Sequence, residues 1–187
     1  MNRILKTALA TLAATAALAL TACEQANTCT YDASAGTLSC SEKTYRTTKI
    51  GGKVWMAENI DIYTPDSSIC YGNDHANCEA MGRLYTWNAA TTGLCPKGWA
   101  LPTQQDFKEA FGNANAAALK EEASFGMKFA GFRYFDGKFA DKGASASFWT
   151  SDSYDDSRAY LVRATDTSIT YEHFNKNIFA SVRCVKE

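Results

Sequence analysis

The chain has few prolines, few histidines and no run of basic residues. Its 187 residues include 3 prolines and 2 histidines, and the formal net charge is −1. Disordered chains are rich in proline and poor in aromatic residues, whereas 12% of these residues are aromatic. That content predicts a packed globular domain. The absence of a basic cluster argues against nucleic acid as a partner.

Common catalytic and metal-binding motifs are also missing. The sequence has no Cys-x-x-Cys pair, and His75 and His173 lie far apart, so a structural zinc site is not expected. It has no Gly-x-Ser-x-Gly motif and no evident nucleophile–base set. No repeat of solenoid length occurs. We therefore expect one non-enzymatic domain without a catalytic residue.

The longest apolar run lies at the N-terminus. Arg3 and Lys6 begin it, and the run over residues 7–20 leads into Thr21-Ala22-Cys23. A secretory signal typically has a basic start, a short apolar centre and small residues just before the site where the signal peptide is cleaved. The run is alanine-rich and shorter than a membrane span of about 20 apolar residues. Residues 1–22 are therefore expected to be removed, which leaves about 165 residues, a size that suits one domain.

The residues around Cys23 resemble a bacterial lipobox. That resemblance implies lipid on the thiol and on the new amino group of Cys23, and hence attachment to the membrane of the cell envelope. Glu24 follows, rather than the Asp that resembles an inner-membrane retention signal, so we expect placement in the outer membrane. An ordinary signal peptide with a coincidental cysteine is the alternative.

Six further cysteines are expected to form disulfides. An even number in an exported chain is typical of a disulfide framework. Six cysteines allow fifteen pairings, and the sequence does not choose among them. We favour two local pairs and one that closes most of the domain, because chain-entropy models give long loops the larger stabilisation. These pairs are Cys29–Cys40, Cys70–Cys78 and Cys95–Cys184.

Turn residues and periodicity predict an α+β domain over residues 44–187, preceded by a tether over residues 23–43 with a hairpin between Cys29 and Cys40. Gly51-Gly52 predicts a hairpin of residues 44–50 and 53–60, and residues 61–79 are expected to be loop-rich. Thr103 should begin a helix that ends at Gly112, with a second helix over residues 114–122. Strands are expected over residues 127–135, 148–152, 158–164, 168–174 and 179–186. One or two early helices followed by antiparallel strands are typical of the α+β class.

Five segments resemble motifs that recur together in the Fibrobacter succinogenes major paralogous domain family. They are residues 49–60, 82–87, 95–103, 148–151 and 181–186. The resemblance covers residues 44–187, and it departs from the usual pattern at Ala100 and at Ala180-Ser181. Its motifs contain all four tryptophans, which we therefore expect in the core.

A wider similarity links residues 98–107 and 181–184 to formylglycine-generating-enzyme domains and so implies a C-type lectin-like fold. In that fold a cysteine before the first helix pairs with one in the last strand, and Cys95 and Cys184 occupy those places. The enzyme uses a late pair of reactive cysteines and copper, whereas this chain has only Cys184 late in its sequence. The Glu/Gln-Pro-Asn/Asp and Trp-Asn-Asp motifs of calcium-dependent lectins are absent.

Ligands of lectin-like folds usually meet the loops of the later strands, which here lie in residues 151–177. Tyrosine, arginine and short polar residues suit recognition, although an ordinary exposed face is the alternative. Asp152, Asp155 and Asp156 are candidate calcium ligands, with a solvated acidic loop as the alternative; otherwise no cofactor is expected. The candidate ligand surface is Tyr154, Asp155, Asp156, Arg158, Tyr160, Tyr171, His173 and Asn175.

Together these features predict a lipid-anchored recognition or adhesion protein with a carbohydrate or protein ligand. The alternatives are an oxidoreductase like the formylglycine-generating enzyme, a metal-dependent enzyme, and a purely structural envelope lipoprotein.

Overall fold

The computed structural model describes residues 29–40, 43–112, 116–120 and 125–187. The expected signal peptide and Cys23 lie outside the described residues. Within those residues the chain forms two six-stranded sheets, a two-stranded ribbon and short helices, which confirms the α+β class. None of the described helices is long and apolar enough to cross a membrane.

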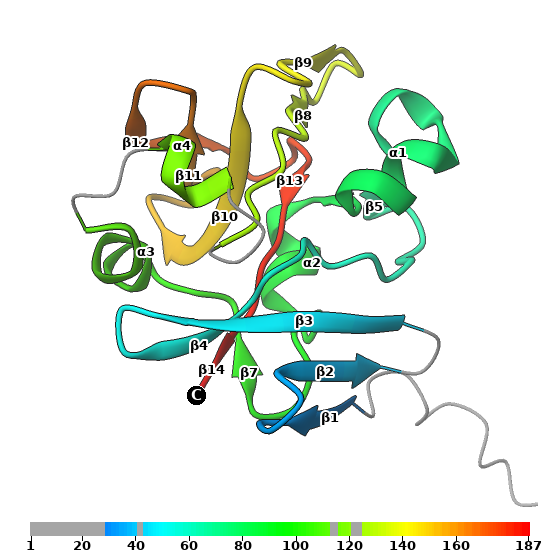
Figure 1. The fold of residues 1–187 in the computed structure, drawn as a ribbon. Coiled ribbons are helices and arrows are strands. Elements are labelled where there is room, and N and C mark those ends of the chain that lie inside the picture. Colours follow the sequence, from blue (N-terminus) through cyan, green and yellow to red (C-terminus); the bar gives the residue numbers. More distant parts are fainter. Residues whose placement is uncertain (1–28, 41–42, 113–115, 121–124) are drawn as a thin grey trace, which may run out of the picture.

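The first sheet contains both ends of the described chain, at the bottom of Figure 1. Its strand order is β1 (Cys29–Asp32), β2 (Thr37–Cys40), β3 (Lys43–Ile50), β4 (Lys53–Met56), β14 (Val185–Lys186) and β7 (Trp99–Ala100). The β1–β2 hairpin expected in the tether pairs with β3 through Leu38 and Tyr45, both of which are buried. The hairpin is therefore part of the domain.

Gly51 and Gly52 form the turn between β3 and β4. Both have positive φ, 58° and 81°, as the predicted hairpin turn requires. A Cβ on Gly51 would lie 2.8 Å from backbone atoms of Glu109 and Ala110. Glycine at this position therefore also lets the hairpin approach helix α3 (Gln104–Phe111).

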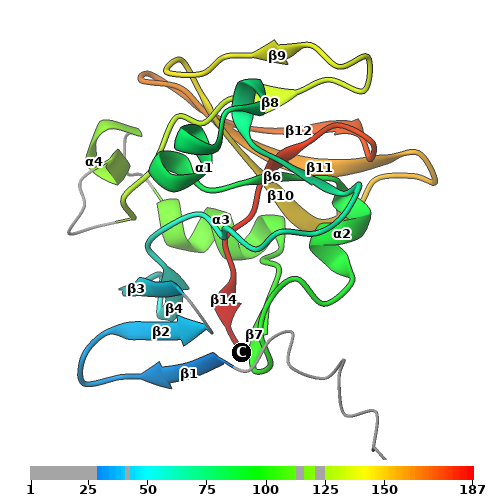
Figure 2. The ribbon, with the colours of Figure 1, turned by 90° about the vertical axis from the view of Figure 1, so that its right-hand side faces the viewer.

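The second sheet has the order β12 (Ile169–Asn175), β11 (Arg158–Ala164), β10 (Ala146–Ser153), β13 (Ala180–Ser181), β6 (Leu84–Tyr85) and β5 (Ser68–Ile69). The expectation of antiparallel strands was wrong for one pair, because β10 and β13 are parallel. The predicted strand over residues 179–186 is divided into β13 and β14. Between these strands the chain crosses from the second sheet to the first (Figures 1 and 2).

The predicted strand over residues 127–135 was largely wrong. The regular strand there is β8 (Phe132–Arg133), which pairs with β9 (Phe139–Ala140). Gly131 adds an isolated bridge to Ala146, and Arg133 one to Phe179. Gly131 has a φ of 66°, and a Cβ at this position would lie 2.2 Å from the carbonyl oxygen of Ala140. A left-handed residue cannot continue a regular strand, so the backbone bends at this glycine.

The described part of the chain contains more helices than expected. They are the 3₁₀ turn η1 (Tyr71–Asn73), α1 (His75–Met81), α2 (Trp87–Thr91), α3 and α4 (Ala116–Lys120). The loop predicted over residues 61–79 was wrong at α1, whose N-cap is Asp74: its side chain accepts from the amide of Ala76. The predicted helix over residues 114–122 corresponds to α4, and its remaining positions lie outside the described residues.

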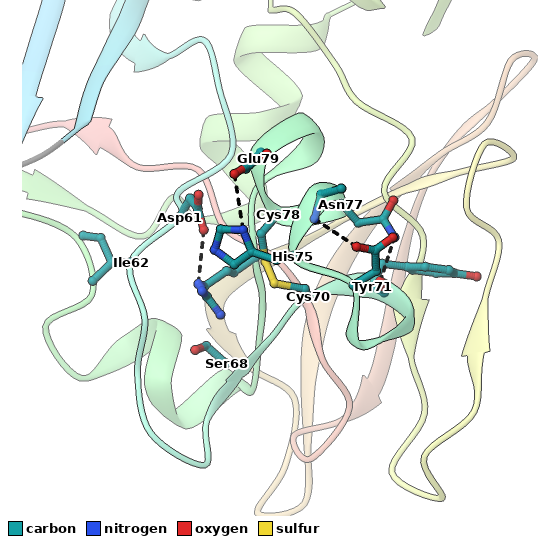
Figure 3. Close-up of a disulfide and its surroundings, with 12 residues drawn as sticks. Asp61, Ile62, Ser68, Cys70, Tyr71, His75, Asn77, Cys78 and Glu79 are labelled. Carbon is teal, nitrogen blue, oxygen red and sulfur yellow. Dashed lines mark hydrogen bonds and ion pairs between the residues drawn. A yellow bond between two sulfur atoms is a disulfide. The ribbon is translucent and has the colours of Figure 1, made fainter.

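Three disulfides have the pairing favoured from the sequence. Their S–S distances are 2.03 Å for Cys29–Cys40, 1.99 Å for Cys70–Cys78 and 2.10 Å for Cys95–Cys184. Figure 3 shows Cys70–Cys78, which ties α1 to the residue before η1; the Asn77 amide donates to the carbonyl oxygen of Tyr71 at 2.8 Å.

One cation is wholly buried in the core. The Nε of Arg183 donates to Asn59 at 2.8 Å, and its other nitrogens donate to the carbonyl oxygens of Phe125 and Gly126. The guanidinium also lies 4.2 Å from the centroid of the Phe125 ring. Burial lowers the pKa of Arg183 to about 9, so the side chain keeps its proton near neutral pH and connects three segments of the chain.

Candidate functional site

A cluster of exposed and half-buried side chains lies on β11, β12 and the turn after β10. We call Tyr154, Asp155, Arg158, Tyr160 and His173 the aromatic patch. Tyr160 and His173 are direct cross-strand partners, so their side chains point to the same face of the sheet. Arg158 is two residues before Tyr160 and therefore lies on that face as well.

The rings of the patch contact one another closely. Tyr154 stacks on His173 with centroids 3.9 Å apart and planes 15° apart, and Tyr160 meets Tyr154 edge-on at 5.4 Å. The guanidinium of Arg158 lies 4.7 Å from the Tyr154 centroid. Tyr154 nevertheless remains 45% exposed. The patch is thus ordered by its own contacts and open to solvent.

Asp155 holds Arg158 in place. Its Oδ2 accepts from Nε of Arg158 at 2.8 Å, and its Oδ1 accepts from the amides of Ser157 and Arg158 at 2.9 and 2.7 Å. These donors, the Arg158 side chain foremost, hold the pKa of Asp155 well below its ordinary range. The carboxylate is therefore ionised at physiological pH and fixes the turn.

The candidate calcium ligands do not converge. Asp152 accepts from the amide of Gln104, the first residue of α3, at 2.6 Å, and the oxygens of Asp155 are engaged as described above. Across the described ranges, no group of three or more His, Cys, Asp or Glu side chains is placed to hold a metal ion. The three aspartates are thus neighbours in sequence with separate roles.

Three other residues of the expected ligand surface lie outside the patch contacts. Tyr171 packs beside α3, where Nζ of Lys108 is 5.1 Å from its ring centroid. Asn175 accepts from the amide of Asn177 at 2.9 Å and closes a turn. The carbonyl oxygen of Asp156 accepts from Lys176 at 3.3 Å. The structure therefore brings together five of the eight expected residues, those that form the patch.

A concave site that the sequence did not predict lies between α2 and the start of α3. We call it the α3 groove, and its volume is about 680 Å³. Strands β7 and β14 contribute to it on one side, α2 on another, and β4 with α3 on a third. Its lining is Lys53, Trp87, Ala90, Thr91, Gly93, Cys95, Trp99, Ala100, Leu101, Thr103, Asp106, Ser151, Val185, Lys186 and Glu187.

An ion pair forms part of the groove wall. Lys53 donates to Asp106, which also accepts from the amide and hydroxyl of Thr103, both at 2.8 Å. Burial opposes ionisation of Asp106, but the Lys53 and Thr103 donors outweigh it and lower the pKa of Asp106. The predicted start of the helix at Thr103 is thus confirmed, and the capping box that Thr103 forms with Asp106 is also part of a cavity.

Lys176 links the groove to the patch. Its Nζ lies 4.3 Å from the centroid of Trp87 and donates to the carbonyl oxygen of Asp155 at 2.8 Å. Trp87 was expected in the core, as Trp55 and Trp149 are, but it is only partly buried. Sequence reasoning missed this site because separate segments form it and its tryptophans were assigned to packing.

A family model described as the Fibrobacter succinogenes major domain matches residues 48–117. The expected family is confirmed over this segment. The matched segment is shorter than the range expected for the family resemblance, residues 44–187, and lies inside it. Most of the groove lining, from Lys53 to Asp106, lies in the matched segment, whereas the entire aromatic patch lies outside it. No curated protein and no solved structure matches the chain.

Proposed function

We propose that this protein is a lipid-anchored recognition or adhesion protein of the bacterial outer membrane, with a C-type lectin-like domain and a carbohydrate or protein ligand. The observation that carries the proposal is the exposed stack of Tyr154 on His173, held beside the Asp155–Arg158 ion pair. Tyrosine and arginine are enriched where binding energy concentrates. Side chains already fixed before binding lose less entropy when a ligand arrives.

The disulfide between Cys95 and Cys184 supports a non-catalytic role for the domain. Cys184 is the late cysteine on which chemistry like that of the formylglycine-generating enzyme would depend, and its sulfur is bonded to Cys95. The pairing also matches the terminal closure of lectin-like domains. A lipid on Cys23 would place β1 within about 20 Å of the membrane surface, because only residues 24–28 intervene.

The test is binding by the full-length protein to a glycan array and, separately, to envelope proteins in a pull-down. Tyr154→Ala is expected to weaken retention of the captured ligand at least about tenfold, a loss of ~1.4 kcal/mol. Thr170→Ala is the matched control, because Thr170 is exposed on β12 with its side chain on the opposite face. Equal retention of every captured ligand by wild type and Tyr154→Ala, or no ligand in either assay, would contradict the proposal.

The anchor is tested on separated membranes. The protein should be recovered with the outer membrane, and Cys23→Ser should release it from that fraction. Recovery in the inner membrane alone would overturn the placement.

A further inference from the structure

We propose that the α3 groove is a second binding site, for a short segment of a neutral saccharide. None of the side chains of the aromatic patch lines this groove. The inference therefore stands on its own geometry and holds whether or not the patch binds a ligand.

The groove has the size of a ligand site. Its volume of about 680 Å³ lies within the range of roughly 300–1,000 Å³ typical of small-molecule pockets. Ser151 and Thr91 of its lining are exposed, so a sugar that is part of a longer chain can reach the groove from solvent.

Its apolar lining suits the C–H face of a sugar ring. Trp87 contributes a partly exposed indole ring, and Ala100 and the largely buried Trp99 of β7 complete the apolar lining. Trp87 is held firmly: its ring nitrogen donates to the carbonyl oxygen of Thr150 at 2.8 Å, and Lys176 lies against its ring. An aromatic ring fixed in this way offers a large contact area at low entropic cost.

The polar lining favours a neutral, hydroxyl-rich ligand. Ser151 and Thr91 place hydroxyl groups on the exposed rim. The Thr91 hydroxyl donates to the carbonyl oxygen of Trp87 at 3.0 Å and can still accept, whereas a serine hydroxyl can both donate and accept. The formal charges of the lining side chains cancel, since Lys53 and Lys186 are matched by Asp106 and Glu187. Because Lys53 is already paired with Asp106, the lining offers no net charge that would favour an ionic ligand over a neutral sugar.

The experiment measures tryptophan fluorescence of the full-length protein in the presence of short neutral oligosaccharides of glucose or xylose. Trp55 and Trp149 are fully buried and Trp99 is only 6% exposed, whereas Trp87 is partly buried, so acrylamide should quench mainly Trp87. A bound sugar is expected to reduce this quenching. Ser151→Trp, which fills the exposed end of the groove, should weaken binding at least about tenfold when followed by calorimetry.

Matched variants separate a blocked groove from a damaged fold. Thr167→Trp introduces the same side chain at an exposed position on another turn and should bind as wild type does. If Ser151→Trp does not fold, Thr91→Trp blocks the groove instead. Trp87→Phe should abolish the sugar-dependent change in quenching.

The inference is overturned if no neutral oligosaccharide binds, if binding survives in both blocking variants, or if a charged oligogalacturonate binds equally well. Tyr154→Ala should leave this binding intact, which distinguishes the groove from the patch.

Discussion

At the scale of single residues, Arg183 is the side chain on which the core most depends. Replacing it with Met would leave the acceptors on Asn59, Phe125 and Gly126 without their donor. Each such loss in the interior costs about 1–3 kcal/mol, so Arg183→Met should lower the free energy of unfolding by roughly 3 kcal/mol or more. Urea denaturation measures this. Arg163→Met, which removes a partly exposed pair with Asp141, should cost under about 1 kcal/mol, and equal costs would contradict the prediction.

Two buried tyrosines predict sensitivity to alkali. Their hydroxyls accept from the amides of Asp61 and Ile62, at 3.0 Å to Tyr45 and 2.8 Å to Tyr85. Burial raises the pKa of Tyr45 to about 12 from 10.0 and raises that of Tyr85 well above the same value. The unfolded chain therefore loses these protons first, and stability present below pH 10 should fall as the pH rises toward 12.

Unfolding midpoints measured against pH check this prediction. Tyr45→Phe should show a smaller fall than wild type above pH 10, because one of the two ionisations is removed. Tyr63→Phe should behave as wild type, since Tyr63 is 66% exposed. A fall of the same size in Tyr45→Phe would refute the assignment.

At the scale of elements, the start of α3 depends on Thr103. Its hydroxyl accepts from the amide of Asp106 at 3.0 Å, and the Asp106 carboxylate accepts in return from the amide of Thr103. Thr103→Ala should lower the free energy of unfolding by about 1 kcal/mol, measured by thermal denaturation. Thr103→Ser keeps the hydroxyl and should retain most of the stability; an equal loss in both variants would mean that the cap is not responsible.

Elements were predictable where their signals are local. Thr103, Asp106 and Gly112 mark both ends of α3 within one short segment, and Gly51-Gly52 marks a hairpin. Helix α1 was missed because its N-cap, Asp74, follows Gly72-Asn73. In that context an aspartate is as typical of a turn as of a helix start. The patch was foreseen in part because the lectin-like resemblance pointed to residues 151–177, where the pairing of β11 with β12 sets Tyr160 opposite His173.

At the scale of the whole molecule, the long disulfide should matter more than the short one. Cys95–Cys184 closes a separation of 89 residues and Cys70–Cys78 one of 8. Chain-entropy arguments give roughly 4.5 kcal/mol for the first and roughly 2.5 kcal/mol for the second. Paired Cys→Ala variants, compared by urea denaturation, should differ by about 2 kcal/mol in that order. A greater loss from Cys70→Ala with Cys78→Ala would oppose this account.

The α3 groove could not have been read from the sequence. Lys53, Lys186 and Trp99 meet there because β14 lies between β4 and β7, and Trp87 and Ser151 join them from α2 and from β10 of the other sheet. No local pattern encodes that adjacency. The family motifs pointed to the segment that builds most of the groove, but motif membership by itself suggests packing as readily as binding.

The central place of the last strands has a consequence for the order of events in the cell. β13 lies inside the second sheet and β14 inside the first, so neither sheet is complete without residues 180–186. A chain made from its N-terminus must therefore leave both sheets unfinished until residues 180–186 emerge from the ribosome. The part of the polypeptide made before them stays open until then, a state that suits the export we propose.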